Sequence, residues 1–124
     1  MVTMTKVMVV DDEEDLRNLV KMVMEKEGFE VESAEDGNDF LEKVDRFQPD
    51  IVILDVMMPG PSTKEILQKL REKGVDPKIV LLTVVRFSNE EIKKLSEMGN
   101  VVGYMTKPFD IPELVSEINK HIKA

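Results

Sequence analysis

The chain has 124 residues, with 17 lysines and arginines against 25 aspartates and glutamates, and a formal net charge of −8. This length fits one domain, and the acidic balance argues against nucleic acid or an anionic membrane as the main partner, because both attract basic surfaces. The absence of cysteine excludes disulfides and thiolate metal sites, and no apolar run approaches the ~18 residues of a membrane span. We expect a single cytoplasmic domain over residues 1–124, with no membrane segment and no fused output module.

The first half of the chain alternates strand and helix patterns. An uninterrupted apolar run at residues 7–10 predicts a strand, and the amphipathic helix that follows should stop near Gly28. Residues 29–34 alternate apolar and polar side chains, which predicts a strand with one face in water, at an edge of a sheet. A second helix pattern leads to another apolar run at residues 51–54. The two helix faces contain Leu16, Leu19, Val20 and Val23, and Phe40, Val44 and Phe47.

The second half repeats this alternation. Apolar runs at residues 79–82 and 101–105 predict two more strands, and Gly74 stands where the helix before them should end. Ser88 with Glu91, and Asp110 with Glu113, have the spacing of helix-capping pairs. The helix faces contain Ile66, Leu67 and Leu70, then Ile92 and Leu95, then Leu114, Val115, Ile118 and Ile122. Runs without alternation indicate strands covered on both faces, so five β–α units predict a doubly wound, parallel α/β domain.

Polar and charged residues follow the apolar runs. Because parallel strands of such sheets form binding sites at their carboxyl ends, these residues should gather at one edge. They are Asp11, Asp12 and Glu13 after the first strand, Asp55 after the third, Thr83 after the fourth, and Thr106, Lys107 and Pro108 after the fifth. Acids, a hydroxyl group and a lysine are therefore expected together.

These motifs resemble the receiver domain of two-component response regulators, in particular stand-alone regulators of the chemotaxis type. The resemblance covers essentially the whole chain. It rests on four segments in order: Val9-Val10-Asp11-Asp12, Asp55-Val56-Met57-Met58-Pro59-Gly60, Leu81-Leu82-Thr83, and Lys107-Pro108-Phe109. It implies a flavodoxin-like (βα)5 fold with strand order 2-1-3-4-5, which puts the alternating second strand at an edge.

The resemblance also implies a role for each site residue. Asp55 would be the phosphoacceptor, and Asp11, Asp12, Asp55 and the backbone carbonyl of Met57 would hold Mg²⁺. Thr83 would hydrogen-bond a phosphoryl oxygen, and Lys107 would pair with the phosphoryl group. The peptide between Lys107 and Pro108 would be cis, and Tyr104 would change rotamer together with Thr83.

The implied function is a phosphorylation-activated signalling switch. A sensor histidine kinase or a phosphotransfer protein would donate the phosphoryl group, and the domain would catalyse its own phosphorylation and dephosphorylation rather than act as a conventional enzyme. The signal would pass to a downstream protein through the helix from Asn89, the strand at residues 101–105 and the helix from Ile111. Homodimerisation on activation through the same face is compatible with this function, and direct binding to nucleic acid is not expected.

Physical arguments support these roles separately. Three crowded carboxylates need a counter-charge, and Mg²⁺ prefers oxygen ligands of this kind. Strands lie ~4.8 Å apart, so in the family strand order a threonine at position 83 can reach from the neighbouring strand. The strand before position 107 lies two spacings from Asp55, and only a long side chain such as lysine closes that gap.

Other interpretations remain open for single residues and for the whole chain. Asp11 and Asp12 could cap a helix, Pro108 could be trans, and Tyr104 could only pack. The domain could be a phosphorylation-independent adaptor with the receiver fold. A Mg²⁺-dependent phosphatase with an aspartate nucleophile is a further alternative. Such enzymes need a second aspartate two residues after the nucleophile as the acid/base, and this chain has Met57 at that position.

Departures from the family pattern concern the rim of the site. Val84 stands where the family usually has a small residue, which predicts narrower access to Asp55. Met57 and Val85 flank the site in the family and are apolar here, so they cannot orient an attacking water, which predicts slow autodephosphorylation. Thr63 replaces a common glycine, so the loop after Asp55 is expected to differ in conformation.

Overall fold

The structure is a computed structural model, and it describes residues 4–84 and 86–122. Its strands form one parallel sheet with the order β2-β1-β3-β4-β5, as predicted. Val85 lies outside the described residues. The strands are β1 (Lys6–Val10), β2 (Glu30–Ala34), β3 (Ile51–Asp55), β4 (Lys78–Thr83) and β5 (Val101–Thr106).

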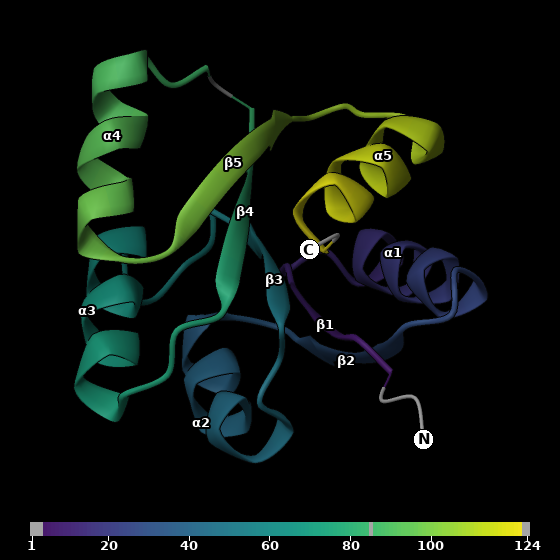
Figure 1. Cartoon of the computed structure of the whole chain (residues 1–124), viewed down its shortest axis with the longest axis horizontal. Helices are drawn as coiled ribbons and strands as arrows, with labels where there is room; N and C mark the ends of the chain where they lie inside the picture. Colours follow the sequence, from purple (N-terminus) through teal and green to yellow (C-terminus); the bar gives the residue numbers. More distant parts are fainter. Residues whose placement is uncertain (1–3, 85, 123–124) are drawn as a thin grey trace.

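Helices cover both faces of this sheet (Figure 1). One face is packed by α1 and α5, and the other by α2, α3 and α4. The helices are α1 (Glu14–Lys26), α2 (Gly37–Phe47), α3 (Thr63–Lys73), α4 (Asn89–Met98) and α5 (Ile111–Ile122). None of the helices formed by the described residues has the length and apolar character needed to cross a membrane.

The central strands are buried on both sides, which explains their uninterrupted apolar runs. In β1, Met8 and Val10 join the core on the α2–α4 face, while Val7 and Val9 join the core on the α1–α5 face. The strands β3 and β4 divide their side chains between the two cores in the same way. Strand β2 is at an edge and only its last residue, Ala34, is buried, as its alternating sequence predicted.

Helix ends follow the predicted signals in most places. At the start of α4, the Ser88 N–H donates to Glu91 Oε1 at 3.0 Å and the Glu91 N–H donates to Ser88 Oγ at 3.1 Å, so the predicted capping box is formed. The Glu113 N–H donates to Asp110 Oδ1 at 2.8 Å. Gly74 ends α3 with φ of 74°, in the left-handed region that glycine tolerates best.

One helix-face prediction is wrong. Leu19 was expected on the buried face of α1, but it is 44% exposed. The buried side chains of α1 are Val20 and Met24. Successive helix residues are rotated by about 100°, so Leu19, one residue before Val20, points away from the sheet.

Candidate functional site

Three carboxylates meet at the carboxyl end of the sheet. Strands β1 and β3 are neighbours, with Val10 opposite Leu54, so the residues that follow them are brought together. Oxygen atoms of Asp11, Asp12 and Asp55 all lie within 4.8 Å of one another. Asp11 is fully buried and Asp55 is 4% exposed, whereas Asp12 is exposed.

Each of the two buried aspartates is held by a local turn, and the two turns have the same hydrogen-bond pattern. The Glu13 N–H donates to Asp11 Oδ1 at 2.9 Å, and the Met57 N–H donates to Asp55 Oδ1 at 3.0 Å. Each of these contacts spans two residues, a pattern common for aspartate in turns. It fixes one oxygen of each carboxylate and leaves Oδ2 for a partner from elsewhere in the fold.

Lys107 is that partner. Its Nζ lies 2.9 Å from Asp11 Oδ2 and 3.3 Å from Asp55 Oδ2. The long side chain therefore reaches from the end of β5 past β4, which lies between β5 and β3 in the sheet. Thr83 is fully buried at the end of β4, and its carbonyl accepts a hydrogen bond from the Lys107 N–H at 2.7 Å. The peptide between Lys107 and Pro108 is cis.

The electrostatics of the site leave an excess of negative charge. Burial and the nearby Asp11 charge raise the pKa of Asp55, against the opposing effects of the Met57 N–H and Lys107. Burial alone would lower the pKa of Lys107, but Asp11 and Asp55 outweigh burial and raise it. One ammonium group thus faces three carboxylates, and this set of oxygen donors could hold a divalent metal ion such as Mg²⁺.

Two apolar side chains are exposed at the rim of the site. Met57 and Val84 are each 60% exposed. Val84 lines a shallow pocket with Lys107 and with residues of α1 and the β5–α5 loop. The Met57 N–H donates to Asp55 Oδ1. Met57 follows Asp55 by two residues, so its carbonyl lies in the same loop.

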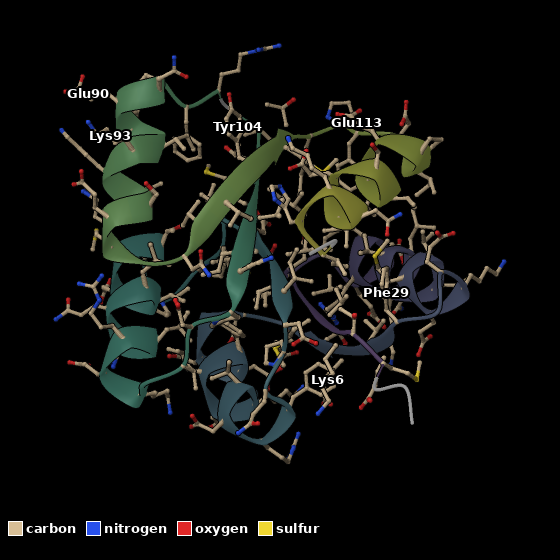
Figure 2. All side chains as sticks on the ribbon, viewed as in Figure 1. Lys6, Phe29, Glu90, Lys93, Tyr104 and Glu113 are labelled. Atoms are coloured by element: carbon tan, nitrogen blue, oxygen red, sulfur yellow. The ribbon has the colours of Figure 1, made fainter. Side chains whose placement is uncertain are left out.

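Tyr104 packs in β5 beside the loop that leads into α4 (Figure 2). Its ring meets Phe87 edge-on, with 5.7 Å between ring centroids and 87° between ring planes. Its hydroxyl donates a long hydrogen bond, of 3.4 Å, to the Phe87 carbonyl. Tyr104 therefore contacts the β4–α4 connection through both its ring and its hydroxyl.

Arg17 was not singled out by the sequence. Its Nη1 donates to the Asp11 carbonyl oxygen at 2.8 Å, which ties α1 to the loop that bears the acidic pair. A single arginine in a helix pattern does not by itself predict such a contact. The sequence indicates only that Arg17, six residues after Asp11, is near the loop along the chain.

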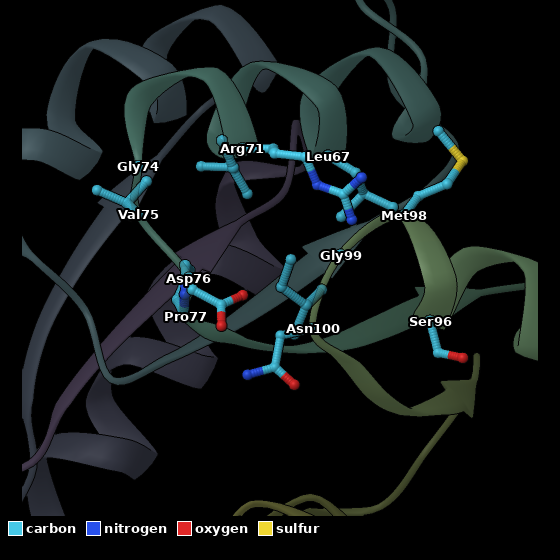
Figure 3. Close-up of a pocket in the computed structure, with 12 residues that line it drawn as sticks. Leu67, Arg71, Gly74, Val75, Asp76, Pro77, Ser96, Met98, Gly99 and Asn100 are labelled. Carbon is cyan, nitrogen blue, oxygen red and sulfur yellow. The ribbon is translucent and has the colours of Figure 1, made fainter.

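A second pocket lies at the opposite, amino end of the strands (Figure 3). It has a volume of about 540 Å³ between α3, α4 and the loops that enter β4 and β5. Its lining includes one carboxylate, Asp76, together with Arg71, Asn100 and mostly small or apolar residues. Size alone therefore does not make it a reaction centre, and the buried carboxylates Asp11 and Asp55 with their partner Lys107 are at the other end.

Comparisons with known proteins agree with the fold and the motifs. The family model of the response regulator receiver domain matches residues 7–119. The transcriptional regulatory protein TrcR of Mycobacterium tuberculosis is 39% identical over 113 residues, which make up 91% of this chain and 43% of that protein. The chain thus spans less than half the length of this relative.

Two solved structures show the same architecture. Chemotaxis protein CheY4 of Vibrio cholerae aligns with a TM-score of 0.83 and 30% identity, over 95% of this chain and 98% of that one. A CheY-like receiver domain protein from Methanospirillum hungatei aligns with a TM-score of 0.82 and 29% identity, over 95% of this chain and 94% of that one.

Proposed function

Since this chain belongs to the response regulator receiver domains of two-component systems, we propose that it accepts a phosphoryl group on Asp55 from a sensor histidine kinase or a phosphotransfer protein. The observation that carries this proposal is the environment of Asp55. This nearly buried carboxylate has two further carboxylates within 4.8 Å and the Lys107 ammonium at 3.3 Å. Such an arrangement serves the transfer of a charged group.

The donor set fits Mg²⁺, with Asp11, Asp12, Asp55 and the Met57 carbonyl as its ligands. Two of the carboxylates are buried and Lys107 is the cation in direct contact with them, so a divalent cation would offset the remaining negative charge. When bound, it would neutralise phosphoryl oxygens and so allow an anionic nucleophile to approach.

The residues of the chain then have separate tasks. Asp55 attacks phosphorus, the P–N bond of a phosphohistidine breaks with its electron pair going to the imidazole nitrogen, and a P–O bond to Asp55 forms. Lys107, already 3.3 Å from Asp55 Oδ2, neutralises charge on the transferred group, and the Thr83 hydroxyl donates to a phosphoryl oxygen. The reaction depends on positioning and charge neutralisation and needs no proton acceptor on the protein.

The output would be a protein contact on the face formed by α4, β5 and α5. Tyr104 lies on this face and contacts Phe87 just before α4. A change at Thr83 would alter the β4–α4 connection and bias the Tyr104 rotamer. A downstream protein, or a second copy of the chain, would bind the activated arrangement.

The rim predicts how long the phosphoryl group persists. Because Met57 and Val84 present exposed apolar side chains, they offer no group that orients a hydrolytic water. We expect slow autodephosphorylation. A lifetime of only seconds in purified protein, followed by intact mass, would contradict this.

Intact mass spectrometry after incubation with acetyl phosphate tests the proposal directly. We expect one added phosphoryl group that requires Mg²⁺ and is absent from the Asp55→Asn variant. The matched control is Asp76→Asn, which removes an exposed carboxylate at the far end of the sheet and should leave the reaction unchanged. No Mg²⁺ binding and no phosphorylation by acetyl phosphate or a kinase would favour a phosphorylation-independent adaptor instead.

A further inference from the structure

The loop between β1 and α1 carries two of the three carboxylates, yet α1 begins without a side-chain cap. Glu13 occupies the N-cap position and makes no capping hydrogen bond. Serine, threonine, aspartate and asparagine are the residues that usually satisfy the first N–H groups of a helix from this position. The conformation of residues 11–13 therefore depends on other contacts.

One of these contacts comes from the Arg17 side chain, and another is the backbone hydrogen bond of the first helical turn. The side-chain Nη1 of Arg17 donates to the Asp11 carbonyl oxygen at 2.8 Å, and its backbone N–H donates to the Glu13 carbonyl at 3.0 Å. On the other side, the Asp11 N–H donates to the Ala34 carbonyl at 3.2 Å. The sheet thus holds the peptide group that precedes Asp11, and the Arg17 side chain holds the peptide group that follows it.

The peptide group that follows Asp11 determines where Asp12 points. The carbonyl of Asp11 and the N–H of Asp12 lie in one planar unit, so a hydrogen bond to the carbonyl also orients the bond into Asp12. Asp11 and Asp55 each have an N–H and Lys107 as partners. Among the described residues nothing hydrogen-bonds the Asp12 carboxylate, which leaves its placement to the backbone.

We propose that Arg17 is a positioning residue for the metal site. Its hydrogen bond to the Asp11 carbonyl orients the Asp11–Asp12 peptide so that the Asp12 carboxylate faces the other two. This inference rests on the proposed function, in which these three carboxylates bind Mg²⁺. Arg17 itself contacts neither the metal nor the phosphoryl group.

The sign of the effect separates positioning from simple electrostatics. If Arg17 acted only as a positive charge near the acidic residues, its removal would strengthen Mg²⁺ binding, because like charges repel. If Arg17 positions Asp12, its removal weakens Mg²⁺ binding although the chain becomes more negative. The two roles therefore predict changes in opposite directions.

The test compares Arg17→Met with Arg46→Met by calorimetric titration of Mg²⁺. Arg46→Met removes the same charge, but the Arg46 side chain is 72% exposed and its Nη2 lies 3.5 Å from Glu32 Oε1 on the edge strand. We expect R17M to bind Mg²⁺ about tenfold more weakly, the scale for groups that orient metal ligands, and R46M to bind as the wild-type chain does. Arg17→Lys keeps the charge without the planar guanidinium and should bind with intermediate affinity.

A second measurement uses the metal-free protein. The amide resonances of Asp12 and Glu13 should shift in R17M, while the amide of Met57 on the other acidic loop should change little. Thermal unfolding of each variant establishes that the comparison is made between folded proteins. If R17M does not fold, R17K carries the test through the same two measurements.

The outcomes distinguish this inference from the function beneath it. R17M that binds Mg²⁺ as tightly as the wild type, or more tightly, overturns the role of Arg17 and leaves the phosphoacceptor proposal intact. R17K with both wild-type affinity and an unshifted Asp12 amide would overturn it where R17M is unfolded. A wild-type chain that binds no Mg²⁺ refutes the proposed function and this inference together.

Discussion

Asp55→Asn is expected to stabilise the metal-free protein while it abolishes phosphorylation. Asp55 lies within 4.8 Å of the carboxylates of Asp11 and Asp12, and each repulsion is worth about 3.5 kcal/mol at an effective dielectric constant of about 20. The attraction to Lys107 at 3.3 Å is worth about 5 kcal/mol on the same scale. The two repulsions together exceed the one attraction by about 2 kcal/mol, and burial of the Asp55 charge acts in the same direction.

The assay is urea unfolding followed by circular dichroism at pH 7 in the presence of EDTA. We expect D55N to unfold with a free energy about 2 kcal/mol above wild type, or a midpoint temperature about 7 °C higher at this chain length. Saturating Mg²⁺ should remove the difference, because a ligand at a hundred times its dissociation constant adds about 2.7 kcal/mol to the form that binds it. The control D76N should stay within about 0.5 kcal/mol of wild type.

A D55N variant that is less stable than wild type in EDTA would refute this reasoning. It would mean that the Lys107 contact outweighs the repulsion among the carboxylates. The excess of negative charge would then not be a cost of the metal-free fold.

Three further predictions follow from the same contacts. The pKa of Asp55 is raised above its ordinary value of 3.8, so its contribution to stability is complete below that value and is lost as the pH rises through the raised pKa. The stability advantage of D55N over wild type in EDTA should therefore shrink as the pH falls from 7 to 4. An advantage that stays constant over this range would contradict the prediction. Lys107→Met should lower the unfolding free energy of the metal-free protein by about 3 kcal/mol, since it removes the cation that contacts buried Asp11 and Asp55. An unchanged urea midpoint would count against a stabilising ion pair between Lys107 and these aspartates. Ser88→Ala should cost about 1 kcal/mol through loss of the capping box, measured against Ser96→Ala, whose hydroxyl contacts a carbonyl within the helix; equal losses would show that the cap contributes nothing special.

The parallel sheet, the edge position of its alternating strand and the meeting of the acids could be predicted because they depend on coarse properties of the sequence, whereas the full strand order came from the family resemblance. Uninterrupted apolar runs are required where a sheet is covered on both faces, and residues after parallel strands must gather at one edge. The reach of Lys107 to Asp55 followed from strand spacing and side-chain length. These arguments need no knowledge of rotamers.

Contacts that depend on rotamers and turn geometry could not be predicted in this way. The Lys107 ammonium lies nearer to Asp11 Oδ2, at 2.9 Å, than to Asp55 Oδ2, at 3.3 Å. The bond from Arg17 to the Asp11 carbonyl depends on how the loop bends before α1. The exposure of Leu19 likewise depends on which side of α1 meets the sheet.

Under the proposed function, the geometry indicates how a charge added at Asp55 would reach the proposed output face formed by α4, β5 and α5. A modification shifts a conformational equilibrium only through contacts that differ between the two states. In the structure the Lys107 ammonium contacts Asp11 and Asp55. A phosphoryl group on Asp55 would offer this ammonium new hydrogen-bond acceptors. Lys107 follows directly on β5, and its N–H donates to the Thr83 carbonyl at the end of β4. Tyr104 lies in β5, three residues before Lys107, and contacts Phe87 ahead of α4. A rearrangement of Lys107 and Thr83 would therefore act on both strands that flank the connection to α4, which favours this face over the distant pocket around Asp76 as the place where the signal leaves the domain.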